Sequence, residues 1–302
     1  MTKLYFGTKL VADETLPLSE LPKDERLRLF NEYLKLVAEQ RCDEDAAFHD
    51  KTVAPKLSRY IYPFKEPIFA QLDGVADELE RLKILLTLDY TQNRELVDYM
   101  LAYGFDEAMK LYLQEDSPFV ANVTKLMQIF FYKGCNVRHW VRDEVHEILA
   151  PYHLELLREY RGQKVPIQVY FERAYNDYKY KLPIKQRRLK FSTHVLTQLL
   201  SYFYPESIDP ESYMSLGPGS KIGVLNLLNL ESASDKKLNA LAIELFNEVR
   251  GLPDYPVDAY HYSTFECQVC YAFNGDIRYN KDIYKGKYYA YKLNLANESR
   301  NN

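Results

Sequence analysis

Apolar residues recur at helical spacing along most of the chain, and this pattern constrains the fold more than any other feature. In residues 23–41, for example, Leu27, Phe30, Leu34 and Val37 follow one another at intervals of three or four. We expect similar helices over residues 68–88, 92–102, 105–114, 120–132, 136–160, 191–203, 222–230, 237–249 and 263–273. The pattern therefore predicts a mainly α fold.

Prolines mark two places where the helical pattern is less regular. Pro151 lies inside residues 136–160, and we expect an interruption there because a proline within a helix loses one hydrogen bond and clashes with the preceding turn. Residues 164–171 alternate well enough for a short strand, although Pro166 and the nearby charges leave that assignment open. Residues 204–212, YPESIDPES, are expected to form a loop.

The composition is that of a globular protein with a sizeable core. The chain has 302 residues, of which 47% are hydrophobic and 27% charged. No apolar run approaches the ~18 residues of a membrane span, and the N-terminus lacks the apolar stretch of a signal peptide. Four cysteines do not indicate a disulfide framework. We expect a cytoplasmic protein with no membrane partner, folded as one compact unit with a helical region over residues 1–160 and a second region over 161–302.

Positive charge is concentrated in two segments, although the formal net charge is −4. Nucleic-acid binding depends on such local patches rather than on net charge. The first segment contains Lys179, Lys181, Lys185, Arg187, Arg188 and Lys190. The second, residues 278–292, alternates basic residues with tyrosines that could stack on bases. A solvated charge run is the alternative interpretation of each.

An otherwise glycine-poor chain places three glycines in GPGSKIG, residues 217–223, directly before an apolar stretch. Glycine permits positive φ and close backbone approach, and the start of the following helix presents N–H groups and the positive end of its dipole. Such a turn can bind a phosphate. Its spacing is also similar to that of helix-hairpin-helix DNA-binding modules, in which a small residue, here Gly223, lets two helices pack closely. A plain turn into a helix with Pro218 near its first position is the alternative.

A longer pattern includes the GPGS turn. It covers residues 191–228, FSTHVLTQLLSYFYPESIDPESYMSLGPGSKIGVLNLL, and the later residues 263–270, STFECQVC. A glutamine on a helix is followed by an acidic loop, a G-P-G-S turn, and then a second helix with a glutamate and a cysteine. This order, over roughly residues 185–280, resembles the phage amino acid:DNA transferases, formerly called α-glutamyl/putrescinyl thymine pyrophosphorylases, which hypermodify thymine in DNA. The matching positions are Gln198, Asp209, residues 217–220, Glu266 and Cys270.

The resemblance implies a helix-hairpin-helix DNA-glycosylase-like helical domain with extra N-terminal helices. It also implies a reaction, in which an amino acid replaces the pyrophosphate of 5-pyrophosphoryloxymethyluracil in double-stranded DNA. The implied partners are that modified DNA and an amino acid, and a phage-encoded enzyme would act in the host cytoplasm. Family members often have a histidine directly after the glutamate, where this chain has Cys267, so no role of that histidine is carried over.

Under this interpretation the catalytic residue is Glu266, which would deprotonate the attacking amine or hold it as an ammonium. The groups expected to bind phosphates and DNA are Gly217, Gly219, Ser220, Lys221, Arg187, Arg188 and Gln198. A structural use of Glu266 is open as well, because Ser263, three residues earlier, could form a capping box with it. The two uses exclude each other at any one moment.

Cysteine and histidine spacings specify no metal site. Cys267 and Cys270 form a C-x-x-C pair, but a structural zinc needs four ligands and the nearby histidine is His261. Buried thiols are the favoured interpretation. Three residues recur every seven positions along one predicted helix and are interpreted as a mixed surface face: His139, His146 and His153. We assign no metal ligand, although a divalent cation such as Mg²⁺ could assist the departure of pyrophosphate.

Two other functions are compatible with the sequence. A helix-hairpin-helix DNA glycosylase would carry a catalytic aspartate after the hairpin, and the candidates are Asp235 and Asp254. A non-catalytic DNA-binding protein is compatible with the helical pattern and with Cys267. Release of a free base would indicate the first, and failure to attach any amino acid would indicate the second.

Overall fold

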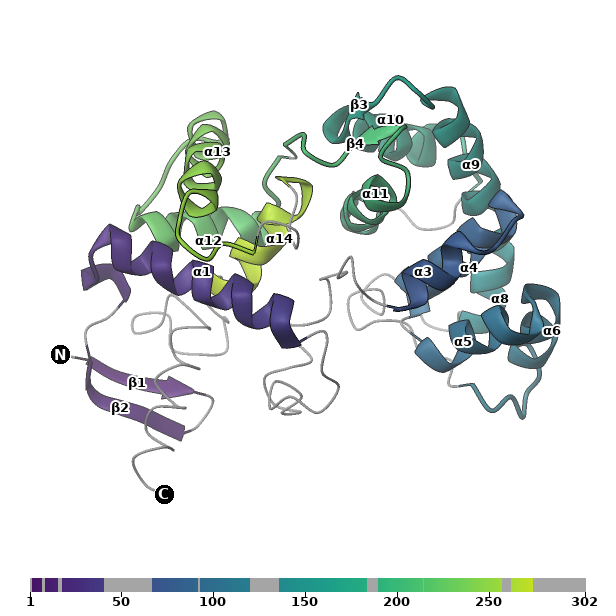
Figure 1. Ribbon diagram of the computed structural model, residues 1–302, viewed down its shortest axis with the longest axis horizontal. Coiled ribbons are helices and arrows are strands. Elements are labelled where there is room, and N and C mark those ends of the chain that lie inside the picture. Colours follow the sequence, from purple (N-terminus) through teal and green to yellow (C-terminus); the bar gives the residue numbers. More distant parts are fainter. Residues whose placement is uncertain are drawn as a thin grey trace. The chain divides into compact units, whose positions relative to one another are not determined.

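The computed structural model describes residues 2–6, 9–15, 18–40, 67–91, 93–119, 136–183, 190–213, 215–256 and 262–273. This part of the chain is mainly helical (Figure 1), as the sequence predicts. The helix expected over residues 120–132 and the segment 278–292 lie outside the described residues. No described helix is both long and apolar enough to cross a membrane.

The chain divides into two compact units. Unit 1 combines Met1–Pro63 with Tyr213–Asn302, and unit 2 consists of Phe64–Ser212. This division differs from the predicted boundary at residue 160 and from the expectation of one compact unit. The reason is that the first long helix packs against the last helices of the chain, so that the middle of the sequence forms a unit of its own.

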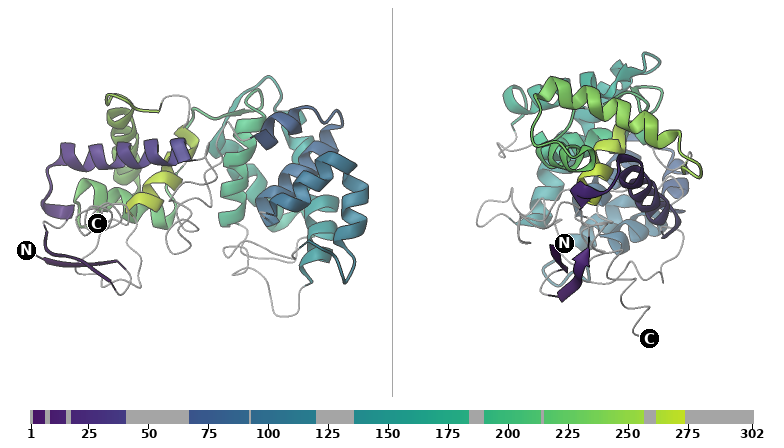
Figure 2. Two further views of the ribbon diagram at one scale, coloured as in Figure 1. Left: turned by 60° about the horizontal axis from the view of Figure 1, so that its bottom comes forward. Right: turned by 90° about the vertical axis from the view of Figure 1, so that its left-hand side faces the viewer.

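Unit 1 contains a hairpin that the sequence pattern did not predict, a 3₁₀-helix and α-helices from both ends of the chain. In chain order the elements are β1 (Thr2–Phe6), β2 (Lys9–Thr15), η1 (Leu18–Glu20), α1 (Lys23–Gln40), α12 (Pro218–Leu228), α13 (Asp235–Arg250) and α14 (Tyr262–Phe273). The two strands pair antiparallel. Helix α1 contacts α12, α13 and α14, and Figure 2 shows these helices gathered together.

Aromatic rings from these helices meet in the core of unit 1. The ring of Phe30 in α1 lies edge-on to two rings of α14, with centres 5.7 Å from Phe265 and 5.6 Å from Phe273. The ring centre of Phe265 also lies 4.5 Å from the ring centre of Phe246 in α13. All four side chains are fully buried. The predicted apolar stripe of the first helix is confirmed at three positions: Leu27, Phe30 and Leu34.

Unit 2 consists of helices and one pair of two-residue strands. In chain order its described elements are α3 (Pro67–Asp73), α4 (Glu78–Thr91), α5 (Arg94–Tyr103), α6 (Phe105–Tyr112), α8 (Val137–Trp140), the π-helix η3 (Val141–Leu149), α9 (Ala150–Glu159), β3 (Val165–Pro166), α10 (Ile167–Tyr180), α11 (Lys190–Phe203) and β4 (Ile208–Asp209). Strands β3 and β4 pair in parallel. Helix α4 packs against α9 and η3, and α10 packs against α11.

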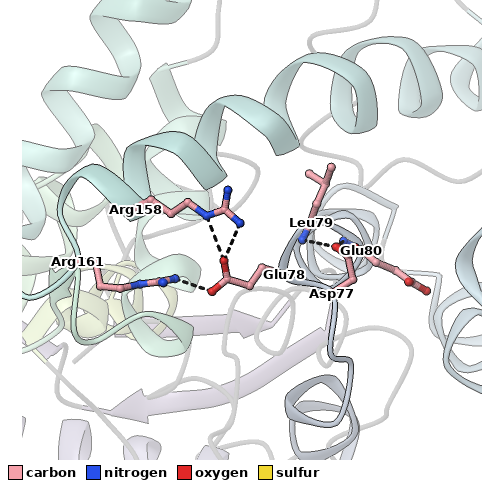
Figure 3. A network of polar contacts seen from close by, with 6 residues as sticks. All are labelled: Asp77, Glu78, Leu79, Glu80, Arg158 and Arg161. Carbon is pink, nitrogen blue, oxygen red and sulfur yellow. Dashed lines mark hydrogen bonds and ion pairs between the residues drawn. The ribbon is translucent and has the colours of Figure 1, made fainter.

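The predicted helix over residues 68–88 is in fact two helices, α3 and α4. Asp77 accepts hydrogen bonds from the N–H groups of Leu79 (2.8 Å) and Glu80 (3.0 Å), as Figure 3 shows. An aspartate in this position caps the N-terminus of a helix. The cap therefore starts a new helix at Glu78 where the apolar pattern alone reads as continuous.

An ion-pair network ties the start of α4 to the end of α9 (Figure 3). Arg158 donates to Glu78 from Nε (3.1 Å) and Nη2 (2.9 Å), and Arg161 donates to the other carboxylate oxygen (2.5 Å). These hydrogen bonds, that of Arg158 first, lower the pKa of Glu78. The network is partly exposed, because the three side chains keep between 27% and 55% of their surface accessible.

The predicted interruption at Pro151 is wrong. Helices α8, η3 and α9 follow one another directly, and Pro151 lies in the first turn of α9. The N–H of Ala150, just before the proline, bonds to the carbonyl of Val145 in the wider π-helical pattern. This wider turn accommodates the proline ring, so the chain changes helix type there and does not break.

The strand expected over residues 164–171 is confined to Val165–Pro166, and helix α10 begins at Ile167. The buried side chains of this helix recur at helical spacing: Ile167, Tyr170, Phe171, Ala174 and Tyr178. The periodicity of the whole segment therefore decides the structure, and the local alternation does not.

Candidate functional site at the start of helix α12

The GPGS turn, residues 217–220, begins helix α12. Gly217 is the N-cap residue, with φ −71° and ψ 169°, and Pro218 lies in the first turn. The backbone N–H of Lys221 donates to the carbonyl of Gly217 (2.9 Å) and closes that turn. Among the described glycines, positive φ occurs at Gly104 and Gly162. The turn therefore does not use the left-handed conformation that its glycines permit.

Glu266 of α14 lies against this turn. Its Oε2 atom accepts hydrogen bonds from the N–H of Gly217 (3.1 Å) and from the hydroxyl of Ser220. Only 4% of the Glu266 surface is exposed. A carboxylate in this position satisfies donors at the helix start and faces the positive end of the α12 dipole. The structure thus brings together three of the predicted site residues.

The capping role of Glu266 differs from the one expected. Helix α14 begins at Tyr262, so Ser263 lies inside the helix and not at its N-cap position. The carboxylate of Glu266 instead caps α12, a different helix, by bonding Gly217. A capping box is a local motif, whereas this contact depends on the packing of two helices.

Gly223 confirms the expectation of close helix packing. A Cβ atom at this position would lie 2.4 Å from the carbonyl oxygen of Val269 and 2.9 Å from its carbonyl carbon. Helix α14 therefore crosses α12 in direct backbone contact. A side chain of any size at Gly223 would force the two helices apart.

Hydrogen bonds to backbone carbonyls hold the other ends of these two helices. Asn226 of α12 donates to the carbonyl of Phe273 at the end of α14 (2.7 Å). Arg26 of α1, which is 6% exposed, donates to the carbonyl of Leu227 near the end of α12 (2.7 Å) and to that of Leu21 (2.5 Å). Burial lowers the pKa of Arg26. Helix α12 thus has a buried carboxylate at its start and a buried guanidinium near its end, matching its dipole.

Asn239 of α13 supports the approach to the turn, and sequence reasoning did not identify it. Its Oδ1 atom accepts hydrogen bonds from the N–H of Leu216 (3.0 Å) and from the hydroxyl of Tyr213 (3.1 Å). Burial, and then the negative charge of Glu266, raise the pKa of Tyr213. An asparagine inside a helix has no sequence signature for such a contact, because its partners lie more than 20 residues away.

The remaining predicted phosphate ligands are not gathered at the turn by the described contacts. Lys221 forms an ion pair with Asp235 at the start of α13 (2.6 Å). Gln198, which is buried in α11, belongs to unit 2. Arg187 and Arg188 lie outside the described residues.

The aspartates considered for a glycosylase are exposed. Asp235 keeps 75% of its side-chain surface accessible and is the partner of Lys221. Asp254 keeps 76% accessible, has φ 62° and pairs with Lys35 (3.5 Å). Neither aspartate contacts the GPGS turn through any hydrogen bond or ion pair found among the described residues.

The interpretation of the three histidines as part of a mixed surface face is wrong. His139 is exposed, but His146 and His153 are buried in unit 2. His146 Nε2 bonds to the hydroxyl of Thr87 (2.7 Å). His153 Nδ1 bonds to the hydroxyl of Tyr170 (2.8 Å), and its Nε2 to that of Tyr178. Burial lowers the pKa of both buried histidines to about 3, so they are neutral partners of hydroxyl groups.

The described residues contain no group of three or more His, Cys, Asp or Glu side chains arranged to hold a metal ion. Cys270 is half-buried, and the side chain of Cys267 lies outside the described part of the structure. Comparison with protein-family models, with curated proteins and with solved structures gave no match for this chain.

Proposed function

We propose that this protein is a DNA-modifying transferase that replaces the pyrophosphate of 5-pyrophosphoryloxymethyluracil in DNA with an amino acid. One observation carries the proposal. The GPGS turn and Glu266, on which the resemblance to amino acid:DNA transferases chiefly rests, are separated by 46 to 49 residues and share a buried carboxylate contact. Residues that serve one site must meet in space, so this contact supports their use as a unit.

We also propose that unit 1 contains the helix-hairpin-helix-like element that the resemblance implies. The direct crossing of α12 and α14 at Gly223 supports this proposal, since these modules rely on a small residue for close helix contact. The GPGS turn is accessible as well, because Pro218 is exposed and Gly219 is partly exposed. A DNA backbone could therefore approach the outer side of the turn.

The proposed reaction makes three physical demands. The modified base must leave the DNA stack to be reached. A neutral amine then forms a bond to the methylene carbon while the carbon–oxygen bond to pyrophosphate breaks, and the nitrogen loses a proton to water. The leaving pyrophosphate needs positive charge, for which we propose Lys221, directly after the GPGS turn. A divalent cation such as Mg²⁺ would add charge at the same place. Arg187 and Arg188 are proposed as ligands of DNA phosphates.

The direct test supplies the full chain with DNA containing pyrophosphorylated hydroxymethyluracil and with each amino acid in turn. The DNA is then digested to nucleosides, which are weighed by mass spectrometry. The proposal expects a nucleoside heavier by one amino acid residue, together with free pyrophosphate. Release of a free base would indicate a glycosylase, and DNA binding without either product would indicate a non-catalytic protein.

Two glycine variants sharpen this test. Gly219→Val, in the GPGS turn, is expected to abolish transfer with little change in melting temperature. Gly251→Ala is the matched control, because a Cβ there would meet only two carbonyl oxygens at 3.4 and 3.6 Å, and it should transfer at the wild-type rate. Equal loss of folding and transfer in Gly219→Val would show that the turn serves helix packing alone.

DNA affinity tests the proposed cations. Arginine contacts to phosphates release counterions, so the logarithm of affinity falls linearly with the logarithm of salt concentration. Replacing both Arg187 and Arg188 with alanine should reduce that slope by about two, roughly one for each phosphate that an arginine no longer neutralises. Lys110→Ala, in an exposed pair with Glu107, serves as the control. An unchanged slope in the double variant would remove these arginines from the interface.

A further inference from the structure

We infer that Glu266 is a positioning residue, which holds the GPGS turn in place and does not take the proton of the attacking amine. The inference rests on the proposed function for its consequence in transfer. Its structural part, the contact between Glu266 and the turn, stands on geometry alone.

The carboxylate is committed to the turn. Its Oε2 atom accepts both the Gly217 N–H and the Ser220 hydroxyl. A Cβ built on Gly217 would lie 3.5 and 3.9 Å from the two carboxylate oxygens, so the whole group lies against the backbone of the turn. With only 4% of the residue exposed, a substrate amine would have to displace these donors to reach Oε2. Oε2 cannot keep both donors and also accept a proton, and Oε1 belongs to the same buried group, so neither oxygen is exposed to a substrate amine.

The rest of the helix is arranged to keep the turn fixed. Arg26 binds the carbonyl of Leu227, so oppositely charged side chains hold both ends of α12. Direct backbone contact at Gly223 fixes how α12 crosses α14, the helix that contains Glu266. The side of α12 that remains open bears Pro218 and Ile222, the latter with 45% of its surface exposed. Glu266 therefore acts from behind the turn, while the exposed side faces solvent.

A single substitution can distinguish the two possible uses of Glu266, as a positioning residue or as a general base. The amide oxygen of glutamine can accept the same two hydrogen bonds, but glutamine cannot accept a proton from an amine. A positioning residue should therefore tolerate Glu266→Gln, whereas a general base should not. Alanine removes the acceptor altogether and serves as the disruptive variant.

The test measures melting temperature and transfer rate for Glu266→Gln and Glu266→Ala, with Glu244→Gln and Glu244→Ala on the exposed side of α13 as matched controls. We expect Glu266→Gln to transfer within about fivefold of wild type, with an unchanged pH profile set by the amino acid's own amine. Glu266→Ala should lose about 100-fold in kcat, because a turn displaced by an ångström is enough for such a loss. Its melting temperature should fall by about 5 °C.

Several outcomes decide the matter. A folded Glu266→Gln protein that is as inactive as Glu266→Ala would overturn the inference and restore the catalytic role. If Glu266→Ala does not fold, Ser220→Ala, which removes one donor, should show a smaller loss of both rate and stability. If the wild-type protein transfers no amino acid, the proposed function fails, but the melting series still decides the structural part. Equal melting temperatures for wild type and Glu266→Ala would then overturn the inference.

Discussion

Two buried polar sites, one in each unit, are held in different ways. In unit 1 the buried charged groups lie at helix ends, where Glu266 accepts hydrogen bonds from the start of α12 and Arg26 donates to its end. In unit 2 the buried histidines are neutral and bond to hydroxyl groups of other helices, as His153 does with Tyr170 and Tyr178. Burial disfavours a charged group, so a charge stays buried only where fixed dipoles or hydrogen-bond donors and acceptors stabilise it, and elsewhere the neutral form is favoured.

This difference has a consequence for mutation and for pH. A carboxylate at a helix end is a local constraint on one backbone turn, so its loss should mainly affect the geometry of that turn. A buried side-chain network connects several helices, so its loss should affect the stability of the whole unit. The predictions that follow separate these two behaviours.

The largest expected effect is at the crossing of α12 and α14. Gly223→Val should destabilise the protein by about 4 kcal/mol or more, because its first side-chain carbon would overlap the carbonyl of Val269. Urea unfolding measures this change. The control is Gly251→Ala, where no such overlap exists. A Gly223→Val protein as stable as this control would mean that the two helices do not cross in contact.

The next effect concerns the core of unit 2. His153→Phe should cost about 2–4 kcal/mol, since the hydroxyl groups of Tyr170 and Tyr178 lose their partner while buried. Replacing both tyrosines with phenylalanine in the same protein should recover part of that loss, because no polar group is then left unpaired. His139→Phe, at an exposed position of the same helical run, is the control. No recovery in the triple variant would contradict the network.

The buried histidines also predict a pH dependence with a defined sign. Their pKa values are lowered from 6.5 to about 3, so below about pH 6.5 the unfolded chain binds protons that the folded chain does not. The stabilising contribution of these two neutral histidines is therefore fully present above about pH 6.5 and is lost progressively as the pH falls toward about 3. Each histidine contributes at most about 1.4 kcal/mol per pH unit.

Urea midpoints at about pH 7 and about pH 5 measure this decline. The double variant Thr87→Val/His146→Leu removes one histidine together with its partner, so its midpoint should fall less over the same interval. An equally steep fall in the double variant would show that His146 does not remain neutral in the folded protein.

The smallest effect is expected at the ion-pair network of Figure 3. Glu78→Gln should cost about 0.5–1 kcal/mol at low salt and less at high salt, because the pairs with Arg158 and Arg161 are partly exposed. Glu107→Gln, in a more exposed pair with Lys110, should have no measurable effect. A larger effect at Glu107 than at Glu78 would contradict this ranking.

Much of the helical fold could be predicted from apolar spacing, and the failures have a common cause. The stripe of Leu27, Phe30 and Leu34 identifies α1 and its buried face, because the spacing of these residues is a property of that helix alone. The break before α4 depends on a single cap at Asp77, and the start of α10 was hidden by a short alternating stretch around Pro166. Apolar spacing does not reveal such local features.

The site could be predicted only in part, because some of its contacts depend on how distant helices pack. Gly223 stands out as a small residue in an apolar helix, and its packing role follows. The contact between Glu266 and Gly217 depends on how two distant helices pack, and the local capping box with Ser263 was the nearer alternative in sequence. His146 and His153 were placed on one helical run correctly, but their burial depends on Thr87, Tyr170 and Tyr178 in other helices.

Hydrogen exchange at the Gly217 amide measures most directly whether the buried carboxylate of Glu266 holds the start of α12. This N–H donates to Oε2 of Glu266, so it should exchange slowly in the wild-type protein and in Glu266→Gln. In Glu266→Ala it should exchange about tenfold faster or more, while amides in the middle of α13 keep their rates. Equal Gly217 exchange rates in wild type and Glu266→Ala would show that Glu266 does not hold the turn.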